Sequence, residues 1–444
     1  MPEWKRRDGF ILVYNELNDR WSRFSDNFGV QSIKVDILTG YHHMQIFVDS
    51  SISGRNTSWL PYDDLTKRSI MSKCYRIGLR VIDTDGAIEI VQQILMEDIE
   101  RASVILEHDK LGFAQLDDQE IFLLDSPLGI SGPKSASHYC FPALKPNGSL
   151  SAFTAGMERL VFRRPTLETA LAIGAVAPVA HLLREEGIID TLPIIALIGT
   201  SSSGKTTSLR ASAALWARPT EGTGIIDNLF ATENAFFAAL ERSKAFPSFI
   251  DETTAAQSVG IQWRFDQMIY LLAQGKGKNR CNASGKLRHT PEFSGCVVFT
   301  GEESLLARTS KHQGLYARIL ELSVDHWTDS DIHADAIRTF ITRHYGAAAP
   351  VMMWWLLQNR RKIPRMFEEE CNDLSNLFAI NPGVESRLIK IAAQIMVGAR
   401  VLNASLEWML DLHAMRSFLA SQLVGSRPQR DKSTTTYDRI LQMI

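Results

Sequence analysis

The stretch from Leu192 to Thr207, LPIIALIGTSSSGKTT, limits most strongly what this 444-residue chain can fold into. The apolar run at 194–198 predicts a buried strand, and residues 207–218 predict a helix. Between them, residues 199–206 carry the GxxxxGK[ST] spacing of a phosphate-binding loop. A chance glycine and serine turn is the alternative, but strand, glycine loop and helix in this order favour a true P-loop.

Each part of this loop has a role in nucleotide binding. Successive backbone N–H groups would face phosphates, and the helix N-terminus adds the positive end of its dipole. Lys205 would reach the outer phosphates of ATP, and the hydroxyl of Thr206 would hold Mg²⁺. The nucleotide-binding candidates are Gly199, Thr200, Ser201, Ser202, Ser203, Gly204, Lys205, Thr206 and Thr207.

A second apolar run, at 246–250, ends in two adjacent acids, Asp251 and Glu252. ATP hydrolysis needs one carboxylate for the metal shell and a second to orient or deprotonate the attacking water. We therefore assign Asp251 to Mg²⁺ and Glu252 to the water. The alternative is an ordinary strand that happens to end in acids.

Two more catalytic candidates lie near later strands. Thr300 ends the apolar run at 295–299, where a polar side chain can sense the γ-phosphate; an ordinary strand-end threonine is the alternative. Arg318 precedes a strand predicted at 319–324 and can act as an arginine finger toward a neighbouring subunit. Arg308 competes for that role, and a surface salt bridge is the alternative.

Positive charge is concentrated between residues 270 and 290, in a chain whose net charge is −2. This segment has no acid, and its turn-forming residues at 282–285 predict a basic hairpin. Such a hairpin suits contact with DNA phosphates, which is electrostatic and independent of sequence. A solvated loop, or a lysine directed at a neighbour's nucleotide, remains an alternative. The candidates for DNA contact are Lys276, Lys278, Arg280, Lys286 and Arg288.

The remaining segments indicate organisation more than chemistry. The first 150 residues predict a mixed α+β domain, with strands at 10–14, 33–38, 44–48, 104–106, 112–115 and 121–124 and helices at 65–79 and 87–102. A helical stretch at 165–186 should kink at Pro178. Helices are predicted at 332–344, 351–361, 365–378, 384–402 and 412–423. Arg387 in the fourth can reach back toward the phosphates, and a structural role is the alternative.

The cysteines and the apolar segments indicate the cellular compartment of the protein. The cysteines at 74, 140, 281, 296 and 371 lack metal-site spacing, which favours reduced and buried thiols in the cytoplasm. The first ten residues contain no apolar signal segment, and the apolar stretch at 170–183 is too short to span a membrane. We therefore expect a cytoplasmic protein without a membrane partner.

Residues from about 190 to 325 resemble the AAA+ class of ATPases. More narrowly, the chain resembles a bacterial family, long labelled a domain of unknown function, that occurs in prophages and mobile genetic elements. Members of that family include MCM-like, self-loading helicases of cassette-chromosome elements. The resembling segments are GTSSSGKTTSL (199–209), ATENAF (231–236), IDE (250–252), YLLAQGKGKNR (270–280), FTGEESL (299–305) and GLYARILEL (314–322).

The resemblance implies an α/β fold with an AAA+ P-loop ATPase core at 151–328 that includes the basic hairpin. It also implies an N-terminal α+β domain at 1–150, a C-terminal α-helical lid at 329–426, and a linker with the start of a further module at 427–444. Six subunits would form a ring with ATP and Mg²⁺ between neighbours and the 276–289 hairpin lining the pore.

In that ring each ATP would be bound by one subunit through four of its own residues, Lys205, Thr206, Asp251 and Glu252. The next subunit would contribute Arg318. Two features depart from the pattern: Thr300 stands where such helicases usually carry asparagine, and the expected winged-helix module is absent or only begun at 437–444.

Three functions fit these observations to different degrees. The first is an ATP-dependent DNA helicase or translocase that serves replication of a mobile element or prophage, with residues 1–150 meeting a replication partner. The second is an AAA+ ATPase that remodels or recruits protein partners, for example in phage defence, without unwinding DNA. A small-molecule P-loop kinase is disfavoured because no acceptor pocket is evident after Glu252.

Overall fold

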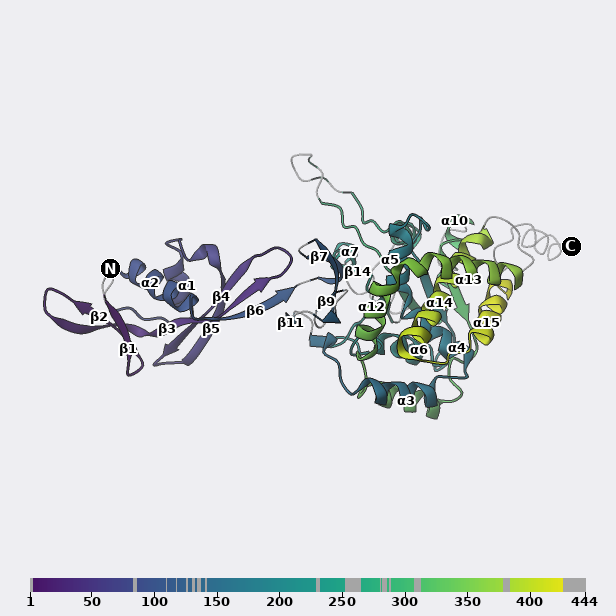
Figure 1. The fold of residues 1–444 in the computed structure, drawn as a ribbon, viewed down its shortest axis with the longest axis horizontal. Coiled ribbons are helices and arrows are strands. Elements are labelled where there is room, and N and C mark those ends of the chain that lie inside the picture. Colours follow the sequence, from purple (N-terminus) through teal and green to yellow (C-terminus); the bar gives the residue numbers. More distant parts are fainter. Residues whose placement is uncertain are drawn as a thin grey trace. The chain divides into compact units, whose positions relative to one another are not determined.

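The computed structural model describes residues 3–82, 86–108, 110–116, 118–124, 127–129, 132–133, 137–139, 142–228, 232–251, 265–279, 281, 286, 289–306, 313–377 and 384–425. The chain forms two compact units. The first comprises Met1–Asp109 with Ser135–Cys140, and the second comprises Lys110–Lys134 with Phe141–Ile444. Both are drawn in Figure 1.

A seven-stranded sheet forms the first unit. Its strands are β1 (Trp4–Arg7), β2 (Phe10–Asn15), β3 (Arg20–Asp36), β4 (His42–Ser50), β5 (Gly54–Pro61), β6 (Ser103–His108) and β11 (Ser137–Tyr139). Strands β1 to β5 are consecutive and antiparallel, whereas β6 runs parallel to β3. The helices α1 (Ile70–Arg76) and α2 (Ala87–Ile99) cover one face (Figure 1) and share a core with that sheet.

The hairpin predicted from 33–38 and 44–48 is confirmed as the pair β3 and β4. Along β4, Met44, Ile46 and Val48 are buried and the residues between them are not, the alternation expected of a strand with one covered face. Strands β1 and β5 are absent from the sequence-based expectation because their polar residues give little apolar alternation; they form by pairing with β2 and β4.

A parallel five-stranded sheet lies at the centre of the second unit. Its spatial order is β13 (Ile226–Asp227), β15 (Ser248–Ile250), β16 (Val297–Gly301), β12 (Ile194–Ile198) and β17 (Ile319–Ser323). Because β12 lies between β16 and β17 and all its residues are buried, its sequence is an unbroken apolar run. The predicted α/β class is therefore confirmed.

Helices surround this sheet. They are α3 (Leu150–Leu160), α4 (Pro165–Ile173), α5 (Val176–Glu185), α6 (Lys205–Ala214), α7 (Glu233–Glu241), α9 (Phe265–Gln274), α10 (Gln313–Tyr316), α11 (Asp331–Ile341), α12 (Ala348–Asn359), α13 (Ile363–Leu377), α14 (Val384–Leu406) and α15 (Leu412–Gly425). The helix α14 contacts α4, α5, α12, α13 and α15 (Figure 1). The segment Glu385–Leu406 of α14 is long and apolar enough to cross a membrane. However, 72% of its most apolar stretch is buried in the protein, as in the core helix of a protein outside a membrane.

The boundary between the units differs from the expected one at residue 150. A second small sheet contains β10 (Gly132–Pro133), β9 (Pro127–Gly129), β8 (Gln119–Leu123), β7 (Leu111–Leu116) and β14 (Ser243–Lys244), in that order. Because β7 pairs with β14, more than a hundred residues later, residues 110–134 join the second unit. Phe113 and Phe122 belong to the same core cluster as α4, α5 and α6. The first boundary therefore lies at residue 110.

The helix predicted at 165–186 bends before Pro178, not at it. The break of 52° falls between α4 and α5. Pro178 lies in the first turn of α5, where its missing N–H leaves no helical hydrogen bond unmade. At the break, the Gly174 carbonyl accepts a hydrogen bond from Trp216 Nε1 (2.7 Å), and a Cβ on Gly174 would lie 2.8 Å from Leu215 Cδ1. The close approach of α6 therefore determines where the chain bends.

Candidate functional site

Residues 199–204 connect β12 to α6, which begins at Lys205. Ser202 and Gly204 adopt positive φ angles of 62° and 90°. Such left-handed residues between ordinary ones form the backbone concavity that binds anions. A Cβ on Gly204 would also lie 2.6 Å from Thr328 Oγ1, so both conformation and space require glycine here.

A buried tryptophan is hydrogen-bonded to the backbone of the loop and of the strand before it. The Trp327 backbone N–H donates to Ser203 O (2.7 Å), and its Nε1 donates to Ile198 O (3.1 Å). Trp327 is 1% exposed. Sequence analysis missed this residue because a single tryptophan beyond the last strand belongs to no motif.

Lys205 and Ser203 place buried polar groups at the loop. Lys205 is 6% exposed; its Nζ donates to Thr200 O (3.2 Å) and lies 3.8 Å from Glu302 Oε1. Among the described residues, the buried Ser203 Oγ has no hydrogen-bond partner. The Ser203 hydroxyl is costly to bury without a partner, and the Lys205 ammonium, which can donate three hydrogen bonds, can take further acceptors. The oxygens of a nucleotide phosphate fit this donor set.

Asp251 accepts two hydroxyl hydrogen bonds on one oxygen. Thr206 Oγ1 donates to Asp251 Oδ1 at 3.0 Å, and Thr300 Oγ1 donates to the same atom at 2.6 Å. The three side chains come from α6, the end of β15 and β16, which meet because β15 and β16 are parallel neighbours. A hydroxyl beside a carboxylate is a hard oxygen donor set, which fits Mg²⁺.

Thr300 is wholly buried, and its hydroxyl points to Asp251. In this arrangement Thr300 positions the carboxylate, and the expected contact with a γ-phosphate stays a prediction. Glu252, the expected partner of the attacking water, lies outside the described residues, as does Arg308.

Glu321 fixes the loop that follows β16, and sequence analysis missed it as well. Ser304 Oγ donates to Glu321 Oε2 (2.7 Å), and the Leu306 N–H donates to Oε1 (3.2 Å). Burial raises the pKa of the Glu321 carboxyl above its ordinary value. This anchored loop carries Glu302, the carboxylate nearest to Lys205 among the ion pairs of the described residues.

The structure places Arg318 against its own subunit. Its guanidinium carbon lies 4.5 Å from the centroid of the Tyr270 ring, and its Nη1 donates to Gly314 O. Arg387 lies exposed in the first turn of α14, and within the described part of the chain no hydrogen bond or ion pair joins it to the P-loop. Neither arginine is therefore brought to the loop within one chain.

The base of the predicted hairpin is anchored through ion pairs. Lys276 lies 2.7 Å from Glu292, and their hydrogen bond lowers the pKa of that carboxyl. Lys278 lies 2.8 Å from Glu233 in α7, and His289 pairs with Glu241 at the other end of the same helix. Two of the five expected DNA contacts are thus already paired with acids.

The other three basic residues are less defined by the structure. Lys286 is exposed, whereas Arg280 and Arg288 lie outside the described residues. The structure therefore does not bring the five basic residues into one described surface.

A solved helicase structure shares the fold of this chain. The structure described as "SCCmec type IV Cch - active helicase" superposes with a TM-score of 0.74, covering 99% of this chain and 81% of that chain at 19% identity. This likeness shows a shared fold. A JCV helicase bound to a small molecule reaches a TM-score of only 0.23, at 16% identity over 50% of this chain and 65% of that chain, and carries no weight. A comparison with curated proteins finds no match.

The family match covers most of the first unit and about half of the second. Residues 31–292 match the family described as "Domain of unknown function (DUF927)", and this range is more than half of the chain. It includes the P-loop, Asp251 and the base of the hairpin. The chain therefore belongs to the DUF927 family.

Proposed function

We propose that this chain is an ATP-dependent DNA helicase or translocase of a mobile element or prophage. The observation that carries the proposal is the meeting of Thr206, Thr300 and Asp251 behind a P-loop whose lysine is buried and whose Ser203 hydroxyl has no partner among the described residues. Such an arrangement suits the binding of a nucleotide triphosphate with its metal.

The strand order supports an AAA+ core. The P-loop follows β12, which lies between β16 and β17 in the sheet. Beyond β16 come β15 and then β13. Helices α11 to α15 would be the lid, although they share one apolar core with α4 to α6. On this proposal the lid packs firmly on the ATPase core.

Each residue then has a role. Lys205 binds the outer phosphates, Thr206 and Asp251 hold Mg²⁺, and Glu252 orients the attacking water. Bound Mg²⁺ would offset negative charge on the phosphates. Arg318 would act from a neighbouring subunit of a hexameric ring, after exchanging its contacts with Tyr270 and Gly314 for the phosphates.

DNA contact is assigned to the hairpin between Lys276 and His289. The solved structure that shares this fold is described as an active helicase, and the proposal carries that role over to this chain. A second candidate is an AAA+ ATPase that remodels or recruits protein partners. The pairing of Lys276 and Lys278 with acids favours it, because paired lysines bind phosphates less well.

Substitution tests the proposal and separates the two candidates. Lys205→Ala and Glu252→Gln should each abolish ATP turnover, whereas Lys145→Ala, at an exposed lysine, serves as the control. Lys286→Ala combined with Arg288→Ala should keep basal turnover but lose stimulation by DNA and unwinding of a forked duplex. Normal unwinding by that double variant would refute the hairpin assignment, and turnover indifferent to DNA would favour the protein-remodelling role.

A further inference from the structure

A cavity of about 680 Å³ lies among α12, α13, α14 and the start of α15. It shares no residue with the P-loop site. Its lining includes Trp355, Lys362, Arg365, Met366, Glu369 and Arg400. Its volume is within the range of about 300–1,000 Å³ typical of small-molecule sites, and a few convergent polar groups on apolar walls are typical of them as well.

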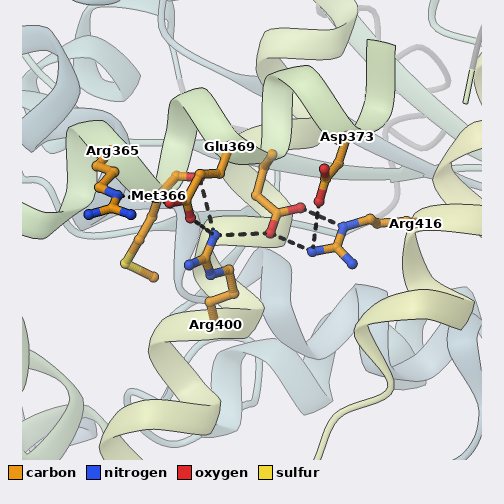
Figure 2. Close-up of polar contacts among 7 residues, drawn as sticks. Arg365, Met366, Glu369, Asp373, Arg400 and Arg416 are labelled. Atoms are coloured by element: carbon orange, nitrogen blue, oxygen red, sulfur yellow. Dashed lines mark hydrogen bonds and ion pairs between the residues drawn. The ribbon is translucent and has the colours of Figure 1, made fainter. Parts of the chain in front are cut away.

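Arg400 occupies the centre of a charged cluster (Figure 2). Its Nη1 lies 2.9 Å from Glu369 Oε2 and 3.3 Å from Glu370 Oε1. Glu370 has no exposed surface, and Arg416 donates to both of its oxygens at 2.8 Å. Because Arg416 forms a bidentate pair with Glu370, Arg400 is not the sole counter-ion of that buried carboxylate.

The cavity lining carries a surplus of positive charge. The lining holds Lys362, Arg365 and Arg400 with one carboxylate, Glu369, so its formal charge is plus two. The adjoining Arg416, Glu370 and Asp373 lower the charge of the whole cluster to plus one. Arg365 Nε donates to Glu369 Oε1 at 2.9 Å. Hydrogen bonds from Arg400 and Arg365 lower the pKa of Glu369, which is therefore ionised at neutral pH. The two exposed cations can turn toward a ligand, since Arg365 is 85% exposed.

The rest of the lining is apolar and held in place. Trp355, Met366 and Leu412 contribute a ring, a thioether and an aliphatic side chain. Asn403 exchanges two hydrogen bonds with the backbone of Leu410, at 2.9 and 3.2 Å, which fixes the turn before α15. A polarisable thioether and an indole favour contact with a flat aromatic group.

We propose that this cavity binds an organic phosphate with a planar aromatic body, the class that includes nucleoside monophosphates. A negatively charged phosphate matches the surplus of positive charge. Guanidinium groups bind both carboxylate and phosphate oxygens in a bidentate manner, but a phosphate has three terminal oxygens and can meet Arg365 and Arg400 together. The apolar wall then takes the aromatic body.

Isothermal titration of the full chain with AMP tests this proposal. AMP lacks the β- and γ-phosphates that the P-loop lysine meets, and variants of the P-loop and of the lining show which of the two sites binds it. One saturable site is expected, and it should persist unchanged in Lys205→Ala. This control separates the cavity from the proposed ATP site, so either proposal can fail without the other.

Exposed residues supply the variants, because Arg400 also contacts buried Glu370 and its truncation can unfold the lid. Lys362→Ala and Arg365→Ala should each weaken AMP binding about three- to tenfold, within the range for one ordinary hydrogen bond, because both side chains are exposed. The adjacent Arg361→Ala, outside the lining, should change it less than about twofold. Glu369→Gln should tighten binding by removing a competing carboxylate.

Four results would overturn the proposal. The first is that AMP gives no saturable heat, and the second is that Lys205→Ala loses AMP binding. The third is that Arg361→Ala and Lys362→Ala weaken AMP binding equally. The fourth is that inorganic phosphate binds as tightly as AMP. The last would show that the apolar wall contributes nothing.

Discussion

Thr206 Oγ1 lies 3.0 Å from Asp251 Oδ1, although 45 residues separate them along the chain. This contact joins the first turn of α6 to the end of β15. It places a hydroxyl and a carboxylate beside the buried ammonium of Lys205, the neighbour of Thr206 in the P-loop. Nucleotide turnover should therefore depend on both sides of this contact.

Asp251→Asn should lower ATP turnover about 10- to 100-fold, the usual effect of removing a carboxylate that orients a metal site. An amide can still accept from Thr206, so the fold should be kept. Steady-state phosphate release at varied Mg²⁺ concentrations measures the effect, and the apparent Mg²⁺ requirement should rise. Asp190→Asn, at an exposed acid, is the matched control; equal turnover in both variants would remove Asp251 from the metal site.

Thr300→Val should destabilise the protein by about 1–2 kcal/mol, because the buried Asp251 loses the hydroxyl at 2.6 Å. Thr300→Ser keeps the donor and should lie close to the wild type in both stability and turnover. Urea unfolding followed by tryptophan fluorescence measures the first quantity. If valine and serine have the same effect, the hydroxyl does not position Asp251.

Lys276→Ala should change DNA affinity less than Arg288→Ala. The Lys276 ammonium already pairs with Glu292 at 2.7 Å, so few counter-ions are released when it meets a phosphate. Each phosphate neutralised contributes about 0.7–0.9 to the slope of log affinity against log salt. Fluorescence anisotropy at several salt concentrations gives these slopes, and Lys145→Ala again controls for surface charge. A larger change for Lys276→Ala would mean that its ion pair opens on DNA.

Gly174→Ala should cost about 1–3 kcal/mol, the range for adding a methyl group to a tightly packed contact. The new Cβ would lie 2.8 Å from both Leu215 Cδ1 and Ser212 O. Gly425→Ala is the control, since a Cβ added to Gly425 would have nothing within 4 Å. A difference between the urea midpoints of the two variants is expected. Equal midpoints would show that α4 and α6 can move apart freely.

Cys281 should be alkylated first among the described cysteines, because its side chain is exposed. This exposure differs from the buried thiols that the sequence predicts. Burial raises the pKa of Cys371 to about 11 and that of Cys74 to about 12, and it raises the pKa of Cys296 further. The thiolate fraction below each pKa grows about tenfold per pH unit, so labelling of Cys371 should rise about 100-fold from pH 8 to pH 10. Mass spectrometry after brief iodoacetamide treatment measures the order. Cys74 reacting before Cys281 would contradict it.

Much of the second unit could be predicted from local patterns. The apolar run of β12, the glycines of the P-loop and the start of α6 are consecutive, and each follows from backbone conformation or strand burial. The break near Gly174 could not, because the proline rule ignores the contact with Trp216. The boundary at residue 110 was missed for a similar reason, since β7 pairs with a strand far along the chain.

The sequence by itself determined the loop, the strand before it, the helix after it, and the acid at the end of β15. Only the tertiary structure decided that Trp327 supports the loop, that Thr300 serves Asp251, and that Lys276 and Lys278 are paired with acids. The physical reason is distance along the chain. A turn or a strand is encoded by neighbouring residues, whereas the partner of a buried polar group is chosen by packing between elements that the local sequence does not relate.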